Sequence, residues 1–310
     1  MTADALVIGE ALVDVITTAD GGPFRHPGGA AANVALGLAR LGESVVLATH
    51  VGPDADGALL RSPLLASGVA VAEVHVDPRR ATFVAHARVA ADGGATYAFD
   101  VDWDIALSGL PDARVVHTGC LGASLRPGAE VVLEFLRGSH GRSTISYDVN
   151  VRPTAIEDIR SARERVEEFV ATSDLVKASV EDLVHLGTGE APDEVATRWS
   201  RTGPVVVLTR GADGASLFAS GRRMDVPSQA VAVVDTVGAG DAFCAAMLAA
   251  LADHGLVGAE RRPRLHGAPP ALWRQVLAFA THAAAITVSR AGAQPPTRAE
   301  IDASVRDGRR

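Results

Sequence analysis

One stretch of the sequence, Val231–Phe243, reads VAVVDTVGAGDAF and carries most of the information about the fold. Its β-branched first half predicts a strand, and the alanine-rich residues that follow predict a helix over Asp241–Asp253. Glycines at such a strand-to-helix junction let successive backbone N–H groups point into one concavity, where the positive end of the helix dipole adds to their field. The stretch therefore predicts an anion-binding turn formed by Gly238, Ala239 and Gly240.

The rest of the chain alternates short β-branched runs with alanine- and leucine-rich stretches, which is typical of parallel β-α-β units. Strands are expected at Ala5–Ile8, Ser44–Thr49, Val115–Thr118, Thr144–Asp148, Leu175–Ala178 and Val205–Thr209. Helices are expected at Ala31–Leu41, Ala55–Ala66, Gly128–Leu136, Ile159–Ala171, Pro192–Arg201 and Asp241–Asp253, and a surface loop at Arg261–Pro270. We expect an α/β fold with a central, mostly parallel sheet that helices cover on both faces.

Two segments depart from this alternation and predict a second, smaller sheet. Leu12–Thr18 alternates in polarity and runs into the glycine-rich stretch Gly21–Gly29, and Thr82–Ala90 and Ala95–Phe99 flank Asp92-Gly93-Gly94, which is a strong hairpin signal. We interpret these segments as a discontinuous β-lid. The predicted lid comprises residues 12–27 and 74–104, and the predicted α/β domain comprises residues 1–11, 28–73 and 105–310.

Composition excludes several classes of protein. Among 310 residues, 37 acidic side chains face 29 basic ones, for a net charge of −8, so we expect no partner among nucleic acids or anionic membranes. The longest apolar run, Ala242–Ala252, is too short to span a bilayer, and Met1–Val7 does not resemble a signal peptide. Cys120 and Cys244 are expected to be buried thiols. These features predict a soluble, cytoplasmic protein.

Lys177 is the single lysine among the 29 basic residues. A Walker A loop and a protein-kinase fold each require a lysine within a defined motif, and neither motif is present. We therefore expect any nucleotide phosphates to be bound by backbone amides and arginines.

Three polar residues are candidates for substrate chemistry. Asp241 is either an ordinary N-terminal acid stabilised by the helix dipole or a base that accepts the proton of an attacking hydroxyl, and the dipole is expected to keep it ionised. Asp14 is either a solvent-facing strand residue or a hydroxyl-binding carboxylate. Asn33, one turn into a helix after Gly28-Gly29, offers a donor and an acceptor to vicinal hydroxyls.

Together, three motifs resemble those of the ribokinase-like (PfkB) carbohydrate kinases, in that family's order and spacing, from about residue 5 to residue 302. They are Gly9-Glu10-Ala11-Leu12-Val13-Asp14, Gly28-Gly29-Ala30-Ala31-Ala32-Asn33-Val34-Ala35 and Asp235-Thr236-Val237-Gly238-Ala239-Gly240-Asp241-Ala242-Phe243. The resemblance implies a three-layer ribokinase-like sandwich with a β-lid. It also implies ATP-dependent phosphorylation of a sugar or a related alcohol.

The resemblance also assigns roles to individual residues. It implies a catalytic base at Asp241, an anion hole at Gly238, Ala239 and Gly240, and sugar contacts at Asp14, Gly28, Gly29 and Asn33. It implies nucleotide contacts at Lys177, Ser179, Thr209, Gly211, Gly214, Gly238, Gly240 and Ala283, and a monovalent-cation site, such as K⁺, at Asp235, Val237 and Gly292. Magnesium is expected to arrive with ATP. Where many members have Asn-x-x-Glu, this chain has Ser179 to Asp182, which leaves Glu181 and Asp182 as candidate magnesium ligands or as acids of a helix N-terminus.

The stretch Asp148-Val149-Asn150-Val151-Arg152-Pro153 resembles an element of fructokinases and 2-dehydro-3-deoxygluconate kinases, with Arg152 as a phosphate-binding candidate. We expect a neutral ketohexose such as fructose, with Arg88 and Tyr97 of the lid contacting it. The alternatives are the acid sugar 2-dehydro-3-deoxygluconate, ribose, a nucleoside, or a catalytically silent sugar-binding regulator. An exposed lid edge is expected to pair with a second copy and form a homodimer.

Overall fold

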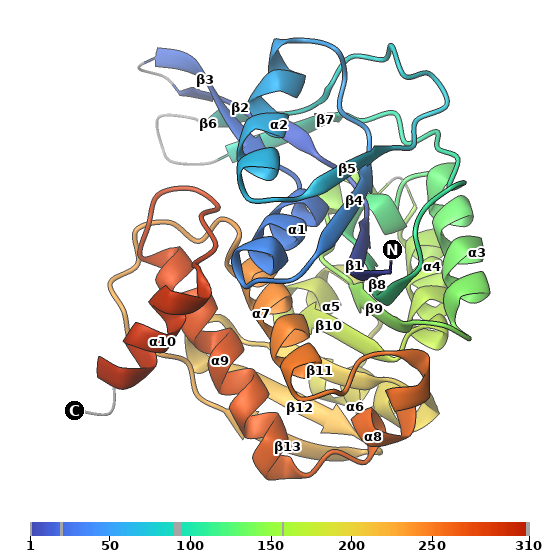
Figure 1. Cartoon of the computed structure of the whole chain (residues 1–310), viewed down its shortest axis with the longest axis vertical. Coiled ribbons are helices and arrows are strands. Elements are labelled where there is room, and N and C mark those ends of the chain that lie inside the picture. Colours follow the sequence, from blue (N-terminus) through green and yellow to red (C-terminus); the bar gives the residue numbers. More distant parts are fainter. Residues whose placement is uncertain (1, 19–20, 90–94, 157, 308–310) are drawn as a thin grey trace.

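The computed structural model describes residues 2–18, 21–89, 95–156 and 158–307. A nine-stranded sheet lies at the centre, with strand order β13-β12-β11-β10-β9-β8-β1-β4-β5 (Figure 1). All of its neighbours are parallel except β11–β12 and β12–β13. Its strands are β1 (Ala3–Ile8), β4 (Val45–Thr49), β5 (Ala70–Glu73), β8 (Ala113–Gly119), β9 (Thr144–Asp148), β10 (Leu175–Ser179), β11 (Val205–Thr209), β12 (Ala215–Ala219) and β13 (Arg222–Val226).

Apolar side chains on both faces of the parallel strands build two cores. On β1, Val7 belongs to the core beneath helices α1, α7 and α9, whereas Leu6 and Ile8 belong to the core beneath α3, α4 and α6. Because successive side chains of a strand point to opposite faces, one run of apolar residues serves both layers. The three-layer α/β fold is therefore confirmed. Its α-helices are α1 (Ala30–Arg40), α2 (Ala55–Ala66), α3 (Gly128–Ser139), α4 (Ile159–Thr172), α5 (Val180–Leu186), α6 (Pro192–Thr202), α7 (Ala239–Asp253), α8 (Arg262–His266), α9 (Pro270–Val288) and α10 (Arg298–Asp307).

A four-stranded sheet, in the order β3-β2-β6-β7, lies at one end of the molecule (Figure 1). It consists of β2 (Leu12–Thr18), β3 (Gly21–Gly28), β6 (Phe83–Val89) and β7 (Ala95–Asp100). These strands come from the two segments that the sequence predicts as a lid, although the predicted turn Asp92-Gly93-Gly94 lies outside the described residues. Val13 and Val15 are buried in the same core as α2, whereas Asp14 between them lies on the other face. The movement of this sheet as a lid stays a prediction.

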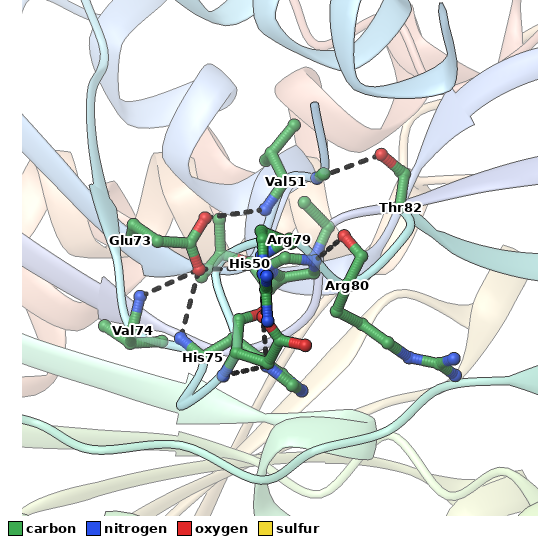
Figure 2. A network of polar contacts seen from close by, with 12 residues as sticks. His50, Val51, Glu73, Val74, His75, Arg79, Arg80 and Thr82 are labelled. Carbon is green, nitrogen blue, oxygen red and sulfur yellow. Dashed lines mark hydrogen bonds and ion pairs between the residues drawn. The ribbon is translucent and has the colours of Figure 1, made fainter. Parts of the chain in front are cut away.

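A polar network around the buried side chain of His50 joins the central sheet to the segment that enters the lid (Figure 2). The Nδ1 of His50, which follows β4, lies 2.8 Å from Oε1 of Glu73, and its Nε2 lies 2.9 Å from the carbonyl oxygen of Arg80. Glu73 ends β5 and also accepts hydrogen bonds from the backbone N–H groups of Val51, Val74 and His75. Since both ring nitrogens of His50 face acceptors, the two bonds together require the doubly protonated ring. This charged pair fixes residues 73–80 to the sheet.

Two expectations for the secondary structure are wrong. Val231–Val234 does not form a strand: it is an exposed segment whose Val234 donates to the carbonyl oxygen of Val288. Arg261–Pro270 is not simply a loop, because it contains α8 and follows the 3₁₀ turn Ala259–Arg261. Arg262 within it binds the buried Asp174, which anchors the segment to the base of the sheet.

Candidate active site

The first turn of α7 presents backbone N–H groups that no side chain caps within the described part of the chain. Gly238 precedes the helix with φ +75°, a left-handed conformation, and a Cβ there would lie 2.6 Å from the Cβ of Ala293. The predicted turn of Gly238, Ala239 and Gly240 is therefore present. Among the described residues, the N–H groups of Gly238 and Gly240 have no backbone acceptor and are available to an anion, whereas the N–H of Ala239 donates to the carbonyl oxygen of Thr236 at 3.3 Å.

Asp241 lies in this turn with 7% of its surface exposed. Its Oδ2 accepts a hydrogen bond of 2.8 Å from Nδ2 of Asn33, in the first turns of α1. The two predicted residues, from the glycine-pair motif and the Gly238 motif, thus meet in one place. The contact fixes the direction of the carboxylate.

Two cations lie near Asp241. Arg152 follows β9 and donates from Nη1 to Oδ1 of Asn150 at 2.6 Å, which orients its guanidinium. Lys177 on β10 donates from Nζ to both oxygens of Asp148, at 2.9 and 2.8 Å. Burial raises the pKa of Asp241, and the Asn33 hydrogen bond and the charges of Lys177 and Arg152 partly oppose that rise. A raised pKa is opposite in direction to the expected dipole effect, and it makes the carboxylate a better proton acceptor near neutral pH.

Asp14 and Gly28 meet on one face of the lid sheet. In the register, Asp14 pairs with His26 on β3 and with Ala85 on β6, so these three residues share that face. A Cβ on Gly28 would lie 2.2 Å from Oδ2 of Asp14, so the glycine makes room for the carboxylate. Burial raises the pKa of Asp14 to about 6, and the charges of Arg152 and His26 limit the rise. The solvent-facing alternative for Asp14 is not supported, because the residue is half-buried and under the influence of Arg152.

The structure does not support Arg88 as a substrate contact. Arg88 is exposed and pairs with Thr17 of β2. Asp14 and Ile16 point to one face of β2 and Thr17 points to the other, so Arg88 lies on the face of the lid sheet opposite Asp14. Tyr97 pairs with Ala87 on β6, but its side chain lies outside the described residues. Its contact with substrate stays a prediction.

Glu10 is a site residue whose role the sequence analysis left open. The side chain is 1% exposed and accepts hydrogen bonds from the N–H of Ala30 at 3.1 Å and from the N–H of Gly122 at 3.0 Å. A Cβ on Gly29 would lie 2.5 Å from the carbonyl oxygen of Glu10. The carboxylate thus holds the Gly28-Gly29 turn against the central sheet. Its position in the Gly9–Asp14 motif is the only sequence signal for this role.

Three of the predicted nucleotide residues, Ser179, Thr209 and Gly211, lie at or just after the carboxyl ends of neighbouring strands. Ser179 ends β10 and pairs with Thr209, which ends β11, and Gly211 is exposed with no heavy atom within 4 Å of an added Cβ. Gly214 has a structural reason, because a Cβ there would lie 2.1 Å from the carbonyl oxygen of Val226. Ala283 is a correction: it is 1% exposed and lies in the core beneath α7 and α9, where it cannot contact a nucleotide.

Asp182 caps a helix and does not fit a magnesium ligand. Its Oδ1 accepts from the N–H of Val151 and its Oδ2 from the N–H of Ser179, both at 2.7 Å, while Ser179 Oγ accepts from the N–H of Asp182. The reciprocal bonds form a capping box, as the structural alternative predicted. Glu181 is exposed in the same turn and keeps its carboxylate available.

Asp235 brings together the three residues predicted to hold a monovalent cation. Its Oδ1 accepts from the N–H of Val237 at 3.0 Å, and its Oδ2 accepts from the N–H of Gly292 at 2.8 Å. Asp235 therefore joins the loop that precedes α7 to the loop that follows α9. Within the described ranges, no group of three or more His, Cys, Asp or Glu side chains could hold a metal ion.

Residues 2–300 match the pfkB family of carbohydrate kinases, and the chain belongs to this family. It is a sugar kinase, as the motifs predicted. In the parts of the chain that the structure describes, none of the helices combines the length and the apolar character needed to cross a membrane.

Known relatives agree with this assignment. The chain is 37% identical over 259 residues to the fructokinase of Rhizobium leguminosarum bv. trifolii, covering 79% of each chain. The structure superposes with a TM-score of 0.87 on the ATP-bound fructokinase of Xylella fastidiosa, at 25% identity, over 99% of this chain and 100% of that one. The fructokinase of Vibrio cholerae O395, with fructose, ADP and calcium bound, gives 0.79 at 25% identity, over 97% of this chain and 98% of that chain.

Proposed function

We propose that this sugar kinase is an ATP-dependent fructokinase, which transfers the γ-phosphoryl group of ATP to a hydroxyl of fructose. The observation that carries the proposal is the placement of Asp241 at the uncapped start of α7, in contact with Asn33 of the sugar-binding motif. One carboxylate thus adjoins both the anion-binding turn and the predicted sugar site. The fructokinase relatives support fructose as the acceptor.

The geometry supports a direct transfer. Asp241 accepts the proton of the sugar hydroxyl while the hydroxyl oxygen attacks the γ-phosphorus of ATP. A new P–O bond forms to the sugar, the bond between the γ-phosphorus and the bridging β-phosphate oxygen breaks, and ADP leaves. The N–H groups of Gly238 and Gly240 stabilise the charge on the moving phosphoryl group. Arg152, which follows the carboxyl end of β9 at the same edge of the sheet, neutralises charge on the phosphates.

The lid favours a neutral sugar over an acid sugar. A sugar carboxylate calls for an arginine on the face of the lid that carries Asp14. Both arginines on the described lid strands, Arg25 and Arg88, pair with Val15 and Thr17 and so lie on the opposite face. This arrangement supports fructose rather than 2-dehydro-3-deoxygluconate.

Magnesium, which would screen the phosphate charges of ATP, fits Glu181 but not Asp182. For the monovalent cation, we retain the site at Asp235, Val237 and Gly292, because the contacts of Asp235 already hold its two loops together. The cation proposal predicts faster ADP release in K⁺ than in tetramethylammonium of equal ionic strength. The lid homodimer also stays a proposal: β3 and β7 are the edge strands of the lid sheet, and a monomeric mass by light scattering would contradict it.

A coupled ADP-release assay with fructose, 2-dehydro-3-deoxygluconate, ribose and adenosine tests the function. We expect the largest kcat/KM with fructose. A larger value with any other acceptor contradicts the proposed substrate. Fructose binding without ADP release from any acceptor, in the presence of Mg²⁺ and K⁺, would instead identify a sugar-binding regulator.

A further inference from the structure

Lys177, the single lysine of the chain, is buried beneath the anion-binding turn. It lies opposite Asp148 in the register of β10 and β9, and its Nζ donates to both carboxylate oxygens at 2.9 and 2.8 Å. The two side chains are 5% and 4% exposed. A two-fold contact of this kind fixes the ammonium group in one position.

The ammonium group lies against the first turn of α7. A Cβ on Gly240 would lie 3.2 Å from Nζ and 3.8 Å from Cε of Lys177. A cation at a helix N-terminus is unfavourable by itself, because the dipole is positive there. The arrangement becomes favourable when a negative group occupies the same turn, and Asp241 and a transferring phosphoryl group are two such groups.

We propose that Lys177, held by Asp148, is a positioning residue that acts through the first turn of α7, where its buried charge keeps Asp241 ionised and attracts the transferring phosphoryl group. The inference rests on the proposed kinase function. Because the side chain of Lys177 is buried and its Nζ is held by Asp148, the proposed role replaces the nucleotide contact that the sequence analysis expected of this lysine. It also explains how one lysine serves phosphoryl transfer without a lysine-containing phosphate loop.

The charges around this pair are consistent with the proposed role. Burial raises the pKa of Asp148 to about 6, and the charge of Lys177 limits that rise. Burial and the charge of Lys177 lower the pKa of His117 to about 3, so His117 adds no positive charge near the pair. The groups that surround Asp241 and the pair are Asn33 on α1, Arg152 after β9, Cys244 on α7, Cys120 in the turn after β8, Asp182 on α5, Glu10 after β1, Asp14 on β2 and His117 on β8.

A purely structural ion pair is the alternative, and the chain provides a matched control. Asp174 directly precedes β10, at the end of the strand away from the site, and its buried carboxylate accepts from Nη2 of Arg262 at 3.0 Å. Removing either pair therefore disturbs the same strand, but only one pair adjoins Asp241.

The test is the pH dependence of kcat at saturating fructose and ATP, which reports groups in the ternary complex. Lys177→Met removes the positive charge, so we expect the acidic limb of the profile, where kcat falls with falling pH, to move up by about one pH unit. On that limb kcat should fall by up to about tenfold. Asp148→Asn removes a negative charge, so we expect the limb to move down. Arg262→Met and Asp174→Asn should lower the melting temperature and leave the limb in place.

Shifts of the acidic limb in opposite directions in Lys177→Met and Asp148→Asn support the positioning role, because general structural damage would not move the limb up in one variant and down in the other. If Lys177→Met does not fold, Asp148→Asn decides alone. A limb that coincides with that of the wild-type protein in every folded site variant overturns the inference. Failure of the proposed function is separate, because the wild-type chain would then release no ADP with any acceptor.

Discussion

Asn33 and Asp241 are 208 positions apart in the sequence, yet Nδ2 of one donates to Oδ2 of the other at 2.8 Å. The bond connects the first turns of α1 and α7, which pack side by side over the central sheet. It joins the proposed sugar-binding motif to the proposed phosphoryl-transfer turn. The carboxylate that we propose as the base is therefore oriented by a residue that we also propose to contact the sugar.

Replacing Asn33 should change the titration of Asp241. The hydrogen bond from the Asn33 side chain lowers the pKa of Asp241, although burial has the larger, opposite effect. Asn33→Ala should therefore raise the pKa of Asp241 by about one unit. We expect the loss of kcat to be largest at the acidic end of the pH profile, where it approaches tenfold, and kcat to recover as the pH rises. A loss of kcat that is the same at every pH would contradict the aiming role.

The space beside Asp14 is predicted to be essential for sugar binding. Gly28→Ala would place a Cβ 2.2 Å from Oδ2 of Asp14, which must then move. We expect KM for fructose to rise about ten- to hundredfold, because a displacement of about 1 Å has effects of this size. KM for ATP should stay within about twofold of the wild-type value.

Gly21→Ala is the control for this experiment, because Gly21 lies on the same strand, β3, and no heavy atom is within 4 Å of an added Cβ. Steady-state kinetics of the two variants decide the matter. Equal effects of both substitutions would show that Asp14 does not contact the sugar.

The His50–Glu73 pair predicts a pH dependence of stability. Burial alone would lower the pKa of His50, but the hydrogen bond and charge of Glu73 outweigh it and raise the pKa above 6.5. Burial would raise the pKa of Glu73, but His50 and backbone N–H groups hold it below 4.5. The contribution of His50 to the free energy of unfolding is fully present below pH 6.5 and disappears as the pH rises through the folded-state pKa of His50. The contribution of Glu73 disappears as the pH falls through the folded-state pKa of Glu73.

Stability from this pair is therefore greatest between about pH 4.5 and 6.5. We expect the free energy of unfolding, from urea titrations, to fall more steeply between pH 6.5 and about 8.5 in the wild-type protein than in His50→Gln. His185→Gln, which replaces an exposed histidine on α5, should keep the wild-type slope. A His50→Gln slope equal to that of the wild-type protein would mean that the imidazole is not charged.

The hydrogen bonds that Asp182 accepts in the helix cap predict that this residue stabilises the fold and does not bind Mg²⁺. Asp182→Asn leaves one oxygen for the two N–H groups of Val151 and Ser179, so we expect a loss of about 1–3 kcal/mol in the free energy of unfolding. The Mg²⁺ concentration for half-maximal activity should not change. In the exposed Glu181→Gln, stability should change by less than about 0.5 kcal/mol, while the Mg²⁺ requirement should rise. The reverse pattern would restore Asp182 as a ligand.

Local patterns predicted the parallel strands well, because a buried β-branched run has few alternatives; Thr144–Asp148 and Val205–Thr209 coincide with β9 and β11. They failed at Val231–Val234, where the same composition forms an exposed segment bonded to the end of α9. A segment forms a strand only where another strand lies beside it, and the residues of Val231–Val234 carry no information about their neighbours in the fold.

The sequence predicted the positions of candidate site residues that lie within a motif, but it did not predict contacts that depend on which strands are neighbours. Asp241, Asn33 and Gly28 follow from glycine-rich turns, and the structure brings the first two together. The face of Arg88 depends on the register between β2 and β6, which the sequence does not specify. The pairing of Lys177 with Asp148 depends in the same way on β9 and β10 lying side by side.

The central claim is that Asp241 accepts the proton of the sugar hydroxyl beside the uncapped start of α7. Asp241→Asn keeps an oxygen that can accept from Asn33, so the fold and the affinity for ATP should remain. The decisive measurement is kcat for ADP release with saturating fructose and ATP. We expect kcat to fall by at least about 10²-fold at unchanged ATP affinity, whereas a kcat within about threefold of the wild-type value would contradict the account.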